Sequence, residues 1–297
     1  MQKLLVICGA TATGKTAIGV QLAKKFDGEL VSADSRQVYK GMDIGTGKDV
    51  KELEGVPLWM IDVVKPDEEY SVSHFTRQAT AVIDDIQKRN KLPILVGGTG
   101  FYIRALLYPF ETLHVPPDST LRKELSHVSV EVLQEMLRLL DTDGFSKMNE
   151  SDQMNPRRLI RKIEISSRGP LGEHRERRAE ENVLSIGLTA PLKELYRRID
   201  VRVEKRMAQG MKAEIQTLKD HGYSWDLPSM HALGYIQWKD AVSDEEAIAR
   251  WKYDEHAYAR RQMTWLHKEK DIVWFDVTNS QFKHSIEKLV GEWYTKK

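Results

Sequence analysis

The segment 9–16 of this 297-residue chain, GATATGKT, constrains the fold more than any other stretch. It matches the phosphate-binding loop pattern, in which a glycine, four residues and a second glycine precede a lysine and a threonine. The apolar run 4–8 before it is typical of a buried parallel strand, and Ile18 and Leu22 after it recur at a helical spacing. This order of strand, glycine loop and helix predicts an anion site, but it does not identify the phosphate compound.

The side chains of the loop suit the same role. Gly9 and Gly14 allow turns that a side chain would block. Lys15 adds a point charge beside the bound anion, and the hydroxyl of Thr16 can hold Mg²⁺.

Composition limits the other classes of protein. The net charge is only +1, so a nucleic-acid surface must be a local patch. No apolar run is long enough to span a bilayer, and the N-terminus enters the first strand without a cleavable signal pattern. The single cysteine, Cys8, excludes a disulfide framework. We therefore expect a soluble cytoplasmic protein.

Asp34 follows the second predicted strand, 29–33, where ligands bind in open parallel sheets. Two roles stay open for it: a turn cap or water-mediated Mg²⁺ ligand, or a general base. Asp62, in the apolar run 57–64, is a weaker candidate for the acid of a nucleotide site. The strand 92–96 ends in a Gly-Gly-Thr-Gly turn with no acid, which argues against a motor ATPase or a GTPase.

Two basic stretches favour anionic partners. Eight Arg or Lys and three Glu lie between residues 157 and 178, in a part of the chain, 118–182, that shows only helical patterns. This concentration favours a phosphate backbone over a solvated helix face. On the long helix predicted over 192–220, Arg198, Arg202 and Arg206 share one face without matched acids, which suggests a second anion site.

Residues 231–237 and 258–266 mix aromatic with basic or amide side chains, as base-stacking surfaces do. Packing of these aromatic side chains in the core is an equal alternative.

The chain resembles the bacterial tRNA dimethylallyltransferases, the isopentenyl transferases that prenylate an adenosine next to the anticodon. The resemblance runs nearly end to end, with Ala10 departing from the usual proline. The segments that carry it are GATATGKT at 9–16, SADSRQVYKGMDIGTGK at 32–48, IDVVKPDEEYSV at 61–72, LVGGTGFYIRALL at 95–107, NPRRLIRKIEI at 155–165, HALGYIQ at 231–237 and YARRQMTWL at 258–266.

The resemblance implies an α/β fold, a parallel-sheet core of the phosphate-loop NTPase type with a helical insertion domain. The core would comprise residues 1–117 and 186–297, and the insertion, residues 118–185, would contact tRNA. The breaks agree with the helical stretch described above.

The resemblance also implies a function: transfer of the dimethylallyl group from dimethylallyl diphosphate to N6 of adenosine 37 in tRNA, with release of diphosphate. The expected partners are the anticodon stem-loop and the prenyl donor, with Mg²⁺ as cofactor and a monomeric enzyme. Asp34 would accept the proton from N6, and Thr16 and Arg202 would act on the leaving group. The implied diphosphate-binding residues are Gly9, Thr11, Ala12, Thr13, Gly14, Lys15, Thr16 and Arg198, with Thr16 as metal ligand.

The resemblance implies further positions that contact tRNA, several of them next to the general base. They are Asp34, Ser35, Arg36, Gln37, Thr99, Arg122, Arg157, Arg158, Leu159, Ile160, Arg161, Leu233, Gly234, Tyr235 and Gln237.

Two other functions compete with this one. A small-molecule kinase of the phosphate-loop class would bind ATP and transfer phosphate, and the basic helix 157–168 argues against it. An RNA-binding protein with a vestigial loop would not need Lys15, Thr16 and Asp34, which are all present.

Overall fold

The computed structural model describes residues 3–108, 115, 117–168 and 182–296, and it divides the chain into two compact units. The first unit comprises Met1–Leu107 and Arg178–Lys297, and the second comprises Tyr108–Arg177. The second unit therefore begins before the predicted break at 118. Residues 183–185, which the predicted boundary assigned to the insertion, belong to a strand of the first unit.

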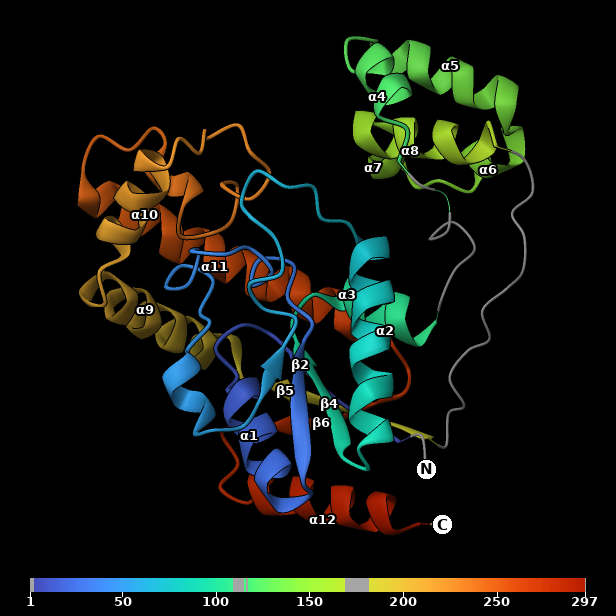
Figure 1. Cartoon of the computed structure of the whole chain (residues 1–297). Coiled ribbons are helices and arrows are strands. Elements are labelled where there is room, and N and C mark those ends of the chain that lie inside the picture. Colours follow the sequence, from blue (N-terminus) through green and yellow to red (C-terminus); the bar gives the residue numbers. More distant parts are fainter. Residues whose placement is uncertain (1–2, 109–114, 116, 169–181, 297) are drawn as a thin grey trace. The chain divides into compact units, whose positions relative to one another are not determined.

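The described part of the first unit contains a six-stranded parallel sheet in the order β3-β2-β4-β1-β5-β6, so the predicted α/β fold is confirmed (Figure 1). The strands are β1 (Leu4–Gly9), β2 (Gly28–Ser32), β3 (Leu58–Trp59), β4 (Leu92–Gly97), β5 (Val183–Thr189) and β6 (Ile272–Asp276). The helices are α1 (Lys15–Lys25), η1 (Val50–Leu53), α2 (Val72–Lys88), α3 (Gly100–Leu107), α9 (Leu192–Ala208), α10 (Met211–Asp220), η4 (Ile236–Trp238), α11 (Asp244–Leu266) and α12 (Phe282–Thr295).

Helices cover both faces of this sheet. Helices α1 and α12 lie together, joined by an edge-to-face contact between Phe26 and Tyr294. Helices α2, α3 and α11 pack together elsewhere on the sheet. From β1 the chain moves to β2 and β3, and after β3 it moves back across the sheet to β4, β5 and β6. Because crossovers between parallel strands are right-handed, this reversal places α2, α3 and α11 on the face opposite to α1.

Two predicted elements differ from the structure. The apolar run 57–64 forms only the two-residue edge strand β3, because Met60 and Asp62 adopt left-handed conformations that end the strand. The helix predicted over 192–220 breaks into α9 and α10 at Gly210, whose φ of +101° no other residue adopts without strain.

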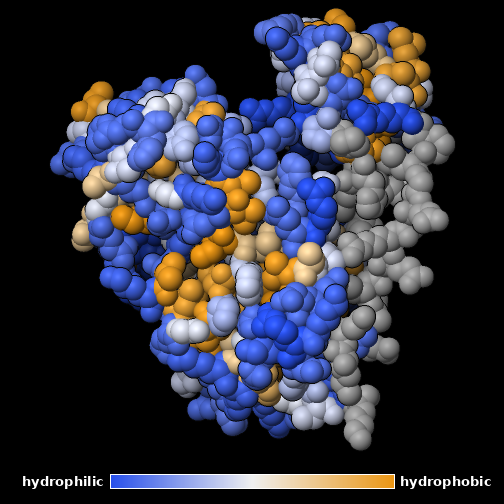
Figure 2. All heavy atoms as spheres, viewed as in Figure 1, coloured by the Kyte–Doolittle hydropathy of each residue, from blue (hydrophilic) through white to orange (hydrophobic). Residues whose placement is uncertain are grey.

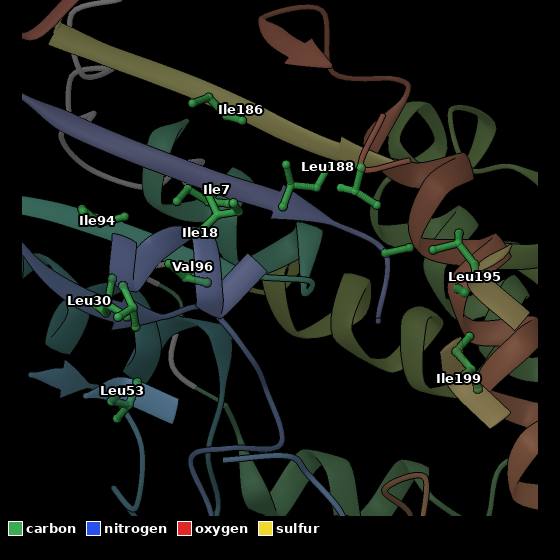
Figure 3. Close-up of a cluster of buried hydrophobic side chains, with 14 of the residues drawn as sticks. Ile7, Ile18, Leu30, Leu53, Ile94, Val96, Ile186, Leu188, Leu195 and Ile199 are labelled. Atoms are coloured by element: carbon green, nitrogen blue, oxygen red, sulfur yellow. The ribbon is translucent and has the colours of Figure 1, made fainter. Parts of the chain in front are cut away.

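The core joins the sheet to the helix that carries the second basic stretch (Figure 3). Ile7 and Leu188 of the central strands and Leu195 and Ile199 of α9 belong to one buried cluster. Leu195 and Ile199 are one turn apart on α9, so their burial fixes the rotation of this helix. This packing therefore sets where the arginines of α9 lie.

The second unit is helical and has a core of its own. It comprises α4 (Ser119–Leu125), α5 (Val130–Leu140), α6 (Thr142–Ser146), α7 (Glu150–Gln153) and α8 (Pro156–Ser166). Leu133 and Leu137 of α5 pack against Leu159 and Ile163 of α8. Val132 and Leu140, apolar residues of the same helix α5, are half exposed, since a helix can press only one narrow face against its neighbour.

Each unit shows both hydrophilic and hydrophobic side chains on its surface (Figure 2). Figure 2 shows hydrophilic side chains over most of the visible face of the first unit, with a band of hydrophobic ones across its middle and another group on the second unit. Within the described residues, no helix has the length and apolar character that crossing a membrane requires.

Candidate active site

A cavity of about 690 Å³ opens in the first unit where β1, β2 and β4 end. Its wall includes the phosphate loop, residues 34–37 after β2, and Gly97 and Gly98 at the end of β4. Side chains of α9 and α11 complete it. Parallel strands present their carboxyl ends at one edge of the sheet, so three segments distant in sequence meet there.

The phosphate loop has the geometry that its glycines predict. Gly9 has a φ of +146°, and a Cβ there would lie 2.3 Å from the carbonyl oxygen of Leu188. Gly14 precedes α1 with a φ of +84°, and the hydroxyl of Thr13 donates a hydrogen bond of 2.8 Å to the carbonyl of Ala10. The loop thus turns tightly into a helix N-terminus, the end of a helix that attracts anions.

Lys15 lies among charged groups of both signs. Its Nζ donates a hydrogen bond of 2.8 Å to the carbonyl of Ala10. Burial, and then repulsion from Arg202, lower the pKa of Lys15 to about 8, against the opposing effects of Asp34 and Glu255. Because charges interact strongly only at close range, the phosphate loop, β2, α9 and α11 contribute to one electrostatic site.

The arginines of α9 have acidic partners, contrary to the expectation of an unmatched stripe. Arg198 donates to Glu194 at 2.7 Å. Arg202 donates to the hydroxyl of Thr11 and, at 3.0 Å, to the buried carboxylate of Glu255. Glu255 lies 53 residues away on α11, so only the fold could reveal this partner. The contact with Thr11 nevertheless places Arg202 directly at the phosphate loop.

Gln262 is a site residue that the sequence reasoning missed. Its Oε1 accepts a hydrogen bond of 2.8 Å from the backbone N–H of Thr11, and its Nε2 donates one of 3.0 Å to the carbonyl of Gly98. The signal was present, because Gln262 lies within the segment 258–266 that carries the family resemblance. Its amide joins the loops that follow β1 and β4.

Asp34 lines the cavity with Lys15 and Thr16. One carboxylate oxygen accepts a hydrogen bond of 2.8 Å from the backbone N–H of Arg36, a turn that aspartate commonly makes. No ion pair joins Asp34 to any other described residue. Asp34 therefore caps a turn, as one of its two predicted roles requires. The turn uses one carboxylate oxygen and leaves the other available to a substrate.

Asp62, the rival carboxylate, has a different role. It pairs at 2.5 Å with Nζ of Lys48, a buried side chain that also bonds Asp43 at 2.7 Å and the carbonyl of Tyr39 at 2.6 Å. Asp62 does not line the cavity. It neutralises a buried charge that holds the loop after β2, a position that does not favour the weaker interpretation of Asp62 as the acid of a nucleotide site.

The residues beside Asp34 form a network around the cavity. Thr99 accepts a hydrogen bond of 3.1 Å from the N–H of Ser35 and is also bonded to Tyr258. Arg36 donates to the carbonyl of Pro228 at 2.8 Å. Gln37 donates to the carbonyl of Gly47 at 3.0 Å. The structure therefore brings the predicted positions 34–37 and 99 together at one end of the sheet.

The segment 231–237 divides into surface and core. Leu233 lines the cavity, whereas Tyr235 and Gln237 are buried. The hydroxyl of Tyr235 donates to Glu214 at 2.6 Å, and Gln237 donates to Asp254 at 2.8 Å. The prediction that Tyr235 and Gln237 contact tRNA directly is corrected, because their polar atoms are bonded within the protein.

The basic helix α8 of the second unit also has structural partners. Arg161 and Arg122 both bond the buried carboxylate of Glu164, at 2.9 Å and 2.6 Å. Arg158 pairs with Asp152. Glu164 is therefore the centre of an ion-pair network. Among the described residues Arg157 alone of these arginines has no ion pair.

Two further predicted contacts on α8 are corrected. Leu159 and Ile160 are buried in the core of the second unit, so they fix the helix and present no surface to RNA. Arg175, Arg177 and Arg178, the end of the basic stretch, lie outside the described residues.

The cavity has oxygen donors that suit Mg²⁺. The hydroxyl of Thr16 and the carboxylates of Asp34 and Asp49 all line it. Hydroxyl, carboxylate and water oxygens are the ligands that this ion prefers, and it commonly keeps several waters. In the described part of the chain no group of three His, Cys, Asp or Glu side chains forms a dedicated metal cage. The site therefore fits an ion that shares its ligands with a bound phosphate compound.

Comparison with known proteins shows what the chain is similar to. The family model described as IPP transferase matches residues 37–269, and the model described as isopentenyl transferase matches residues 2–64. A curated relative from a Roseiflexus species, a tRNA dimethylallyltransferase, is 40% identical over 99% of this chain and 99% of its own length.

Solved structures that are similar to this chain come from the same class of transferases. The tRNA isopentenylpyrophosphate transferase of Bacillus halodurans has a TM-score of 0.74 and 35% identity, covering 99% of this chain and 97% of that one. A eukaryotic dimethylallyltransferase, captured acting on tRNA, has a TM-score of 0.83 and 26% identity, covering 98% of this chain and 78% of that one.

Proposed function

Because the chain belongs to the IPP transferase family, we propose that it is a tRNA dimethylallyltransferase. It transfers the dimethylallyl group from dimethylallyl diphosphate to N6 of adenosine 37, next to the anticodon, and releases diphosphate. One observation carries the proposal: the phosphate loop, Arg202 and Asp34, a carboxylate that forms no ion pair with the described residues, line the same cavity.

The diphosphate of the donor binds at the phosphate loop. Backbone N–H groups at the start of α1 and the charge of Lys15 attract its oxygens. Arg202 extends this cationic wall and neutralises charge as the leaving group departs. Arg198, on the previous turn of α9, lines the cavity as well. The loop recognises only oxygen atoms and charge, so it serves a prenyl diphosphate as well as a nucleotide.

Thr16 would hold Mg²⁺ together with the diphosphate, with Asp34 or Asp49 in reach through water. The bound ion supplies positive charge that stabilises the departing diphosphate.

Asp34 acts as the general base. The N6 amine of adenine is a weak nucleophile because its lone pair is delocalised into the ring. As the new C–N bond forms, this nitrogen becomes acidic and must lose a proton. The carboxylate oxygen of Asp34 that is not engaged by Arg36 accepts it. The adenosine must leave its stack to reach a cavity between protein loops, as in other enzymes that act on bases.

The tRNA backbone contacts basic side chains of the second unit, with Arg157 as the best placed of those described, because it lacks an internal ion pair. Thr99 and residues 34–37 surround the flipped adenosine. Leu233 adds an apolar surface beside it.

One experiment separates this function from a phosphate-loop kinase. The enzyme is incubated with Mg²⁺, unmodified tRNA and dimethylallyl diphosphate labelled in the prenyl group. Label in the tRNA, lost when adenosine 37 is replaced by guanosine, is the expected result. Consumption of ATP with no label in RNA would instead support the kinase.

A further inference from the structure

Arg206 is the least exposed of the three arginines that α9 presents to the cavity. It is 5% exposed, yet it lines the cavity one turn after Arg202. Its Nη1 donates a hydrogen bond of 2.9 Å to the carbonyl of Gly45. Its Nε is buried and has no hydrogen-bond partner among the described residues. A buried polar atom without a partner calls for an explanation, and a bound ligand is one.

The guanidinium group of Arg202 also has a nitrogen without a hydrogen-bond partner among the described residues. Its Nε is also buried without a partner in the described part of the chain, although its Nη2 bonds Thr11 and Glu255. Two neighbouring guanidinium groups on the wall of one cavity therefore each have an unused donor. Guanidinium groups bind phosphate oxygens through pairs of such donors.

On the described wall of the cavity, the seven lysine and arginine side chains outnumber the four acidic ones, Asp34, Asp49, Glu52 and Glu255. Glu255 is the acid between them: its Oε2 lies 3.0 Å from Arg202 Nη2 and its Oε1 lies 3.7 Å from Arg206 Nη1. Lys15 adds a third cation at the same cavity. Burial, and then repulsion from Arg202, lower the pKa of Arg206 to about 10. An excess of buried positive charge is costly, and a multiply charged anion would offset it.

Contacts in the core of the first unit hold the side chain of Glu255 in place. The residue is 4% exposed, and its Oε1 also accepts a hydrogen bond of 3.3 Å from the indole of Trp251, which is itself buried. The carboxylate is thus fixed by the core of α11 and fixes two arginines in turn.

We propose that Arg206 is a further diphosphate-binding residue and that Glu255 is a positioning residue, which holds Arg202 and Arg206 as a pair for the two phosphate groups of the donor. The inference rests on the proposed function, and it adds a consequence: the arginine pair selects a diphosphate over a monophosphate. The phosphate loop with Lys15 can bind one phosphate group, and the second requires the further pair.

Arg206 has a structural alternative. It contacts the loop 45–47 so closely that a Cβ on Gly47 would lie 2.1 Å from its Nη2. An arginine that only supported this loop would affect stability, and it would affect both classes of ligand alike. The ratio of the two affinities therefore separates the roles.

The test measures binding of dimethylallyl diphosphate by calorimetry with Mg²⁺, and binding of dimethylallyl monophosphate by competition. The variants are Arg206→Gln and, as control, Lys193→Gln, which removes one exposed charge from the same helix outside the cavity. For Arg206→Gln we expect diphosphate affinity to fall about 10- to 100-fold and monophosphate affinity less than about threefold. Lys193→Gln should match the wild type for both ligands.

Equal losses for the two ligands, or an unchanged diphosphate affinity in a variant with a native melting temperature, would overturn the role of Arg206. A wild-type protein that binds neither ligand would instead contradict the proposed function. If Arg206→Gln does not fold, Arg206→Lys takes its place. Lysine keeps the charge but has no fork of donors, so a selective loss of diphosphate affinity is still expected.

Glu255→Gln tests the positioning role. The substitution removes a negative charge near the anion, so electrostatics alone would make diphosphate bind more tightly. A positioning role predicts weaker binding, by about 10-fold, because neither arginine is held in place. Tighter or unchanged binding would overturn it.

Discussion

The side-chain amide of Gln262 accepts a hydrogen bond of 2.8 Å from the backbone N–H of Thr11, although 251 residues separate the two in the chain. The same amide donates to the carbonyl of Gly98 at 3.0 Å. Helix α11 thereby fixes the phosphate loop against the loop after β4. The shape of the anion site depends on this bond as much as on the glycines of the loop.

Gln262→Glu tests the dependence. The carboxylate can accept from Thr11 but cannot donate to Gly98, whose carbonyl it would repel. We expect the free energy of unfolding to fall by about 1–3 kcal/mol, with weaker binding of the donor. Denaturant unfolding and calorimetry measure the two effects. Native stability together with native donor affinity would show that the amide does not hold the loop.

The pKa of Lys15 predicts how donor binding depends on pH. With a pKa of about 8, Lys15 is charged below pH 8 in the free protein and loses its proton as the pH rises further. Donor affinity should therefore fall above pH 8, by up to about tenfold per pH unit. Without ligand, the unfolded lysine retains its proton up to a pKa of 10.5, so this group makes the free protein more stable as the pH rises between these values.

Lys15→Arg and Lys15→Ala serve as the matched pair for this titration. Arginine stays charged, so its variant should lose the decline in affinity above pH 8. Lys15→Ala should weaken donor binding by about 1.5–3 kcal/mol at neutral pH. A decline that persists unchanged in both variants would assign it to another group.

Asp34→Asn should abolish proton acceptance while it preserves size and the turn with Arg36. We expect the single-turnover rate to fall by about 10²–10⁴, with tRNA and donor binding within a few-fold of the wild type. Asp62→Asn is the control, since Asp62 pairs with Lys48 outside the cavity. It should lower stability and leave the rate of the folded enzyme nearly unchanged.

Two results would count against the general base. One is a normal rate in Asp34→Asn with a slow Asp62→Asn, and the other is complete loss of tRNA binding in Asp34→Asn.

The arginines of α8 should separate into two groups. Arg157→Gln should weaken tRNA binding and reduce its salt dependence by a slope of up to about one, with no change in melting temperature. Arg161→Gln leaves Glu164 with only one arginine side chain, so it should destabilise the second unit by about 1–3 kcal/mol. Binding at several salt concentrations and thermal unfolding measure the two. An unchanged salt slope in Arg157→Gln would make Arg157 a solvated side chain.

Local sequence patterns predicted much of the architecture. The strands β1, β2 and β4 and the phosphate loop follow from apolar runs and glycine spacing, because short stretches of backbone determine them. Gly210 was present in the sequence too, yet helical patterns on both sides concealed the break there. The shortness of β3 also escaped prediction, since an apolar run does not reveal the left-handed conformations of Met60 and Asp62 that end the strand.

The chemical groups of the site can be read from the chain alone: a phosphate loop with Lys15 and Thr16, a carboxylate at the end of a strand, and arginines on one face of a helix. Which of these groups meet depends on how the chain packs. Packing paired Asp62 with Lys48, buried Tyr235, and brought Glu255 to Arg202 and Gln262 to Thr11. Backbone conformation responds to neighbouring residues, whereas ion pairs and hydrogen bonds depend on distances that exist only after distant segments have packed together.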